Sequence, residues 1–180
     1  MTGTDEAGVA VVEPGVIRVP RLPRVGHPWR GPALACAVTV IGGLLLPVLL
    51  LRLWDADLAV PLSAAGDGPQ TQMFAQGVIE AGWFLRNDRL GMPGGQELYD
   101  FPMADHLHFA SIKVIGLAFP DAALAVNLFY LLTFPLVALT ALYFLRQLGV
   151  GYPVAVVAAL LYCCLPCHFL RGTSLSLIHI

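Results

Sequence analysis

Three long apolar runs constrain this chain more than any other feature. They lie at about 33–53, 122–145 and 152–170, and as helices each would cross the ~30 Å hydrocarbon core of a bilayer. The whole chain is 57% hydrophobic and only 12% charged, whereas soluble domains carry roughly 25% charged residues. We therefore predict an all-α integral membrane protein with three transmembrane helices.

The charges outside these runs predict how the chain crosses the membrane. Segment 1–32 holds four arginines against three acids, and 146–151 holds Arg146 and no acid, whereas 54–121 holds nine acids and three basic residues. Because short cytoplasmic segments of membrane proteins are enriched in Lys and Arg, we expect 1–32 and 146–151 in the cytoplasm and 54–121 outside. Segment 1–32 is also rich in proline, which favours a disordered tail.

The long extracytoplasmic segment is expected to contain two helices that lie at the membrane interface. Over about 71–85, Phe74, Val78, Ala81 and Leu85 follow helical spacing, with polar residues between them. The second helix, about 106–119, is apolar but too short to cross a bilayer. Between the two, glycines, prolines and acids predict an irregular loop, and such loops often carry the functional residues of membrane enzymes.

Asp67 is the first candidate catalytic residue. Glycines flank it on both sides, so that a ligand can approach the backbone closely. A carboxylate can act as a general base or bind a hard divalent cation, of which Mg²⁺ or Mn²⁺ would be typical, although the sequence specifies no cofactor. Capping of the following helix is the alternative role.

Three further residues near the second interfacial helix complete the candidate site. Asp105 is a second catalytic candidate, with capping of the helix at 106–119 as its alternative. Asp100 and His106 are candidates for substrate binding, although Asp100 is equally typical of a turn. His106 and His108 would point to different sides of a helix, so they predict no two-histidine metal pair.

This order of features resembles the C-type glycosyltransferase (GT-C) superfold. The shared order is a cytoplasmic start, one span, a long outer segment that opens with an acid, two interfacial helices and closely spaced spans. GDGPQTQMFAQGVIEAGWFLRNDRLGMPGGQELYDFPMADHLHF, NLFYLLTFPLVALTALYFLRQLG and LPCHFLRG are in addition similar to a group of bacterial glycosyltransferase-like membrane proteins. The resemblance covers about residues 50–172. It implies that Asp67 contributes to the catalytic or metal site, and that a second acidic motif lies in a later outer loop.

The resemblance implies a function and a location. We expect the N-terminal part of a polytopic glycosyltransferase of the bacterial inner membrane, which moves a sugar from a polyprenyl-phosphate donor to an extracytoplasmic acceptor. The expected partners are the lipid bilayer and that donor, with no nucleic acid. The alternative is a non-catalytic membrane protein, such as a transporter component or an envelope assembly factor. Transport would be favoured by a pathway of charged residues, but the expected spans contain no acid.

The end of the chain departs from the similar proteins. Residues 171–180 read RGTSLSLIHI, and the last six of them, Leu175 to Ile180, resemble the translation of a sequencing adapter. We therefore expect a truncated or artefactual end and no activity from the 180 residues alone.

Overall fold

The structure is a computed structural model that describes residues 31–62, 66–91, 93–100 and 106–171. Its elements are α1 (Gly31–Leu50), a short 3₁₀ helix η1 (Leu53–Asp55), α2 (Gly68–Ala81), β1 (Arg86–Asn87), β2 (Gln96–Glu97), α3 (His106–Ala118), α4 (Ala122–Gln147), α5 (Tyr152–Cys163) and α6 (Pro166–Arg171). Within these residues, three helical stretches are long and apolar enough to cross a membrane, namely α1, α4 and α5 together with α6 as far as Leu170. The prediction of a mostly helical chain with three helices of this kind is confirmed. Asp105, residues 1–30 and residues 172–180 lie outside the described residues.

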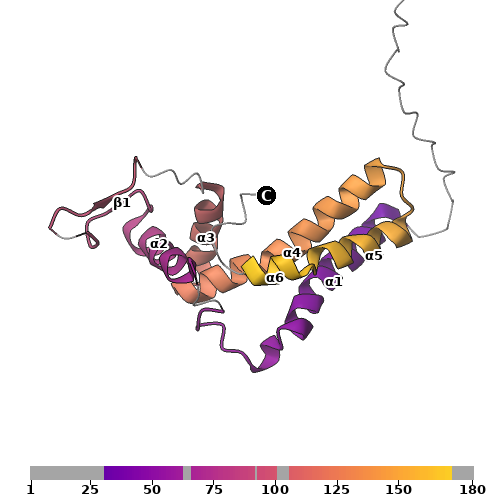
Figure 1. Ribbon diagram of the computed structural model, residues 1–180, viewed down its shortest axis with the longest axis horizontal. Helices are drawn as coiled ribbons and strands as arrows, with labels where there is room; N and C mark the ends of the chain where they lie inside the picture. The colour runs from indigo at the N-terminus through magenta and orange to yellow at the C-terminus, as the bar shows by residue number, and fades with distance from the viewer. Residues whose placement is uncertain (1–30, 63–65, 92, 101–105, 172–180) are drawn as a thin grey trace, which may run out of the picture.

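Helices α1, α4 and α5 pack together as one bundle (Figure 1). Ala35 near the start of α1 shares a buried cluster with Leu142 near the end of α4, whereas Gly43 further along α1 lies against Pro135 earlier in α4. The two helices are therefore antiparallel. A Cβ atom on Gly43 would come within 2.8 Å of the Pro135 Cα atom, so glycine allows these two backbones to approach closely.

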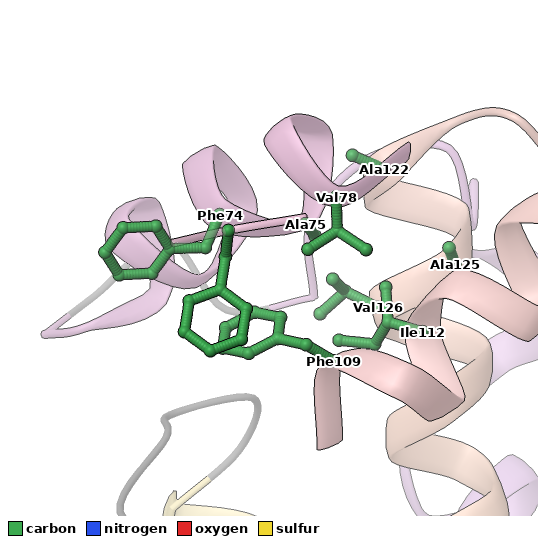
Figure 2. Close-up of a cluster of buried hydrophobic side chains, with 9 residues drawn as sticks. Phe74, Ala75, Val78, Phe109, Ile112, Ala122, Ala125 and Val126 are labelled. Carbon is green, nitrogen blue, oxygen red and sulfur yellow. The ribbon is translucent and has the colours of Figure 1, made fainter. Parts of the chain in front are cut away.

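A second packed unit is formed by α2, α3 and the first turns of α4 (Figure 2). Its core is a set of buried apolar side chains: Phe74, Ala75, Val78, Phe84, Phe109, Ile112, Ala122, Ala125 and Val126. Gly116 of α3 faces Ile79 of α2, and a Cβ atom there would come within 2.7 Å of the Ile79 side chain. Helix α4 thus belongs to both units, with its first half against α2 and α3 and its second half against α1 and α5 (Figure 1).

Helix α2 has different ends from those expected for 71–85. It begins at Gly68 and stops at Ala81, because Gly82 takes a left-handed conformation with φ 100°. Leu85 therefore lies outside the helix, although it still packs against the core of this unit. The following stretch, expected to be irregular, contains the antiparallel pair β1 and β2, in which Arg86 faces Glu97.

Candidate functional site

Asp67 stands immediately before α2, at the position that the sequence indicates. Its side chain is exposed and makes no capping hydrogen bond. The Asp67 backbone carbonyl instead accepts hydrogen bonds from the Thr71 amide at 2.9 Å and from the Thr71 hydroxyl at 3.1 Å. Gly66 before it has φ 59°, a conformation that a side chain would disfavour. The Asp67 carboxylate therefore does not cap α2, which was the alternative role considered from the sequence.

The other candidate residues lie in different surroundings. Asp100 is exposed in a turn after β2. His106 is the first residue of α3, and its ring stacks on Trp83 with centroids 6.0 Å apart and contacts Phe84 at 5.4 Å. Within the described residues, no hydrogen bond or ion pair joins Asp67, Asp100 and His106 to one another. The same part of the chain contains no group of three or more His, Cys, Asp or Glu side chains placed to hold a metal ion.

Several acidic residues of the long segment form ion pairs with arginines. Arg89 pairs with Glu80 at 2.8 Å, and Arg86 lies 3.0 Å from Asp88 and 4.0 Å from Glu97. These side chains are exposed, and such surface pairs typically contribute less than about 1 kcal/mol. Asp88 and Glu97 are therefore surface residues around the hairpin, whereas no ion pair of the described residues involves Asp67.

Lys113 holds the end of α2 against α3. Its ammonium group donates to the backbone carbonyl of Gly82, just after α2, and lies 5.8 Å from the centroid of the Trp83 ring. A cation at the C-terminus of a helix is favoured by the partial negative charge of the last carbonyls. This contact fixes Trp83, on which the His106 ring stacks.

Asn127 in the first turns of α4 is a residue whose role the sequence did not reveal. Its side chain is completely buried, and its amide nitrogen donates to the carbonyls of Leu58 and Val60, both at 2.8 Å. Its oxygen accepts a hydrogen bond from the Leu62 amide at 3.1 Å. One side chain thus fastens the chain that leaves the first span to the start of the second.

His168 in α6 is a second residue whose role the sequence did not reveal. Its ring is buried and stacks on Phe134 of α4, with centroids 4.1 Å apart and planes 3° from parallel. Nε2 lies 2.9 Å from the Thr133 hydroxyl, and Nδ1 lies 3.1 Å from the Cys163 carbonyl oxygen. The presence of an ionisable side chain inside an apolar run could have indicated His168 from the sequence.

His108 is also buried, but it lies in the unit of α2, α3 and α4. It stacks on Phe129 at 4.3 Å, while His106 is exposed, so the two histidines do face different sides of α3. Burial lowers the pKa of His108 to about 4. The ring is therefore neutral at physiological pH and serves as a packing residue.

Comparison of the chain with protein-family models, with curated proteins and with solved structures finds no match in any of the three. The part of the chain that the structure describes is mostly helical, with three helices suited to span a membrane and a folded segment between the first two.

Proposed function

We propose that this chain is part of a bacterial membrane glycosyltransferase that transfers a sugar from a polyprenyl-phosphate donor to an acceptor outside the cytoplasm. The observation that carries the proposal is the Asp67 carboxylate, which is exposed, forms no ion pair among the described residues and precedes a packed unit built on α4. A lipid-linked donor needs a reactive group close to the membrane surface. The resemblance to the GT-C superfold suggests Asp67 as that group.

The Asn127 contacts support a position near the membrane for Asp67. Leu62 is hydrogen-bonded to Asn127, and it precedes Asp67 by five residues, which span at most about 18 Å when fully extended. The start of α4 and the end of α1 lie at the same end of the bundle, because these helices are antiparallel. By the distribution of positive charge, we place that end outside the cytoplasm and the N-terminus inside.

The chemistry that we assign to Asp67 is general-base catalysis. Its carboxylate takes the proton of an acceptor hydroxyl, whose oxygen forms a bond to the anomeric carbon of the sugar. The bond between that carbon and the phosphate oxygen breaks, and its electron pair leaves with the polyprenyl phosphate. Asp105 remains proposed as a second catalytic residue, with Asp100 and His106 as substrate contacts.

One observation favours the alternative of a non-catalytic transporter component. His168 is an ionisable residue buried between helices that are suited to span a membrane, and such residues often mark transport pathways. The two proposals differ in whether a covalent product forms.

The test is a transfer assay with the complete gene product in membranes, supplied with a labelled polyprenyl-phosphate sugar. Mild acid cleaves the sugar from the polyprenyl-phosphate donor. We expect labelled product that survives this treatment, and no such product in membranes that lack the protein. Label that crosses the membrane while it remains on the lipid would instead support transport and overturn the proposal.

A further inference from the structure

Helix α3 is apolar on two opposite sides. On one side, Phe109 and Ile112 are buried against α2 and α4. On the other side, Leu107, Val114 and Leu117 are 82%, 68% and 81% exposed, and their spacing along the chain places them on one face of the helix. We call these three side chains the exposed face of α3. Because a helix that is apolar all round is normally covered all round, this face indicates a partner beyond the described residues.

The exposed face of α3 carries no charge. Lys113 is the one Lys, Arg, Asp or Glu residue in this helix. Its ammonium group donates to the Gly82 carbonyl at the end of α2 and lies near the Trp83 ring, so it does not belong to the exposed face. A polar partner would need charges or hydrogen-bonding groups to recognise. The partner that fits this face is therefore apolar.

Helix α2 differs from α3 in this respect, although the sequence predicts an interfacial position for both. The large apolar side chains of α2 pack into the core that it shares with α3, and none of them is exposed. Its outer side carries the exposed Gln70 and Glu80, and Glu80 is paired with Arg89. Only α3 offers a surface to an apolar partner, and α3 lies between that partner and α2.

The contacts of α4 give the level of α3 along the bundle. Phe109 and Ile112 pack on the first turns of α4, up to Val126. The next residue, Asn127, holds the carbonyls of residues 58 and 60 and the amide of residue 62, in a segment without regular structure that follows the exposed Asp57. Carboxylates and lipid-exposed irregular backbone are excluded from the hydrocarbon core of a bilayer. The first turns of α4, and α3 with them, therefore lie at the edge of that core.

The direction of α3 is that of a helix lying on a membrane. It runs at a wide angle to α4 rather than along it (Figure 1). With 13 residues it is about 20 Å long, which is too short to cross a bilayer. The short connection 119–121 joins it directly to the start of α4. A helix at this level with one uncharged apolar face is suited to lie in the plane of the interface, with that face toward the acyl chains.

From this arrangement we propose that the exposed face of α3 is inserted into the lipid leaflet beside the start of α4, and that α2 rests on α3 without touching lipid. Acyl chains are the occupant because the face is uncharged and lies at the edge of the hydrocarbon core. A second copy of the chain, or another protein segment, would instead cover the face with packed side chains. The proposal does not depend on sugar transfer.

The test is electron paramagnetic resonance of the full chain in lipid nanodiscs, with its four native cysteines replaced by alanine and one nitroxide label in each variant. Oxygen dissolves in lipid and a nickel chelate stays in water, so the ratio of their collision rates with the label reports contact with acyl chains. We expect a ratio several-fold higher in Leu107→Cys, Val114→Cys and Leu117→Cys than in Gln70→Cys, the matched control on the exposed side of α2. The ratio should stay below that of Ile41→Cys, which is exposed in the middle of α1.

Two results of this experiment would overturn the proposal. A ratio on the exposed face of α3 equal to that of Gln70→Cys would place the face in water. Low collision rates with both reagents would mean that protein covers the face.

A second measurement uses the wild-type chain, so it decides even if the cysteine-free variants fail to fold. Phospholipids with a photoreactive group in the acyl chain are activated in the same nanodiscs, and the modified residues are located by mass spectrometry. We expect modification of α3 and none of α2. An unmodified α3, or equal modification of both helices, would contradict the proposal.

Discussion

The Asn127 side chain accepts a hydrogen bond from the Leu62 amide, although the two residues lie 65 positions apart in the chain. Asn127→Leu would remove this bond and the two bonds to Leu58 and Val60, leaving their backbone groups without protein partners. Each hydrogen bond lost at this part-buried position costs about 0.5–1.5 kcal/mol. We expect limited proteolysis between η1 and α2 to be at least about tenfold faster in this variant. Thr140→Val, which removes an exposed hydroxyl from the same helix, is the control and should digest like wild type. Equal rates for all three proteins would mean that Asn127 does not fasten this segment.

Asp67→Asn in the complete gene product tests the general base. Asparagine keeps the size of the side chain and an acceptor oxygen but cannot take up a proton. We expect normal expression and an initial rate of sugar transfer lower by about 10²-fold or more. Asp88→Asn removes a carboxylate that is paired with Arg86 on the surface and should retain nearly full activity. If Asp67→Asn is as active as Asp88→Asn, the role of base passes to Asp105.

Gly43→Ala tests the close contact between α1 and α4. The added Cβ would meet the Pro135 backbone at 2.8 Å, and the backbone cannot move aside easily. We expect a loss of about 1–3 kcal/mol, measured by unfolding in mixed detergent micelles. Gly42→Ala is a matched control, because both substitutions improve helix propensity equally. The Cβ atom added at Gly42 would meet only the end of the Leu160 side chain, at 2.9 Å, and that side chain can rotate away. Gly42→Ala should be the more stable variant, and the reverse order would contradict the packing described.

The buried His108 predicts a pH dependence of stability. Its pKa is about 4 in the folded chain and about 6.5 when exposed by unfolding, so between these values the unfolded state binds more protons. Stability should therefore rise from pH 4 to pH 6.5, by up to about 3 kcal/mol from this group alone, and change little above that range. The unfolding midpoint measured across this range in His108→Gln should show a weaker slope. His106→Gln, which alters an exposed ring, should keep the wild-type slope.

The orientation that we predict from the arginine distribution can be measured with reporter fusions. A reporter at Arg146, between α4 and α5, should read as cytoplasmic, and a reporter at Gly94, between β1 and β2, should read as extracytoplasmic. A cytoplasmic signal at Gly94 would place Asp67 on the wrong side for an extracytoplasmic acceptor.

The sequence predicts the spans well because their signal is local. An uncharged apolar run about 20 residues long has few other stable folds, and α1 and α4 lie close to the expected ranges. The end of α2 is harder to predict, because the apolar spacing continues to Leu85 although the helix stops at Gly82. Leu85 keeps the pattern because it contacts the same core from an extended segment.

The roles of Asn127 and His168 could not be predicted from spacing. Each depends on partners that are brought near only by the packing of helices, such as Thr133, which lies 35 positions before His168. Asp67 shows the opposite case, since its exposed position before a helix follows from the local GDGP sequence alone. The chemical role of Asp67 cannot be predicted from the local sequence, because the same residues would surround a catalytic base and a surface carboxylate.

If α4 spans the membrane as we propose, its length would give the lipid environment a part in the proposed function. With 26 residues the helix is about 39 Å long, more than the ~30 Å hydrocarbon core of a typical bilayer. Such a helix tilts in a thin membrane and stands more upright in a thick one. The unit of α2 and α3 is built on its first turns and would move with it. Acyl-chain length would then act as a tuning variable, setting the height of the Asp67 carboxylate relative to the phosphates of the lipids around it.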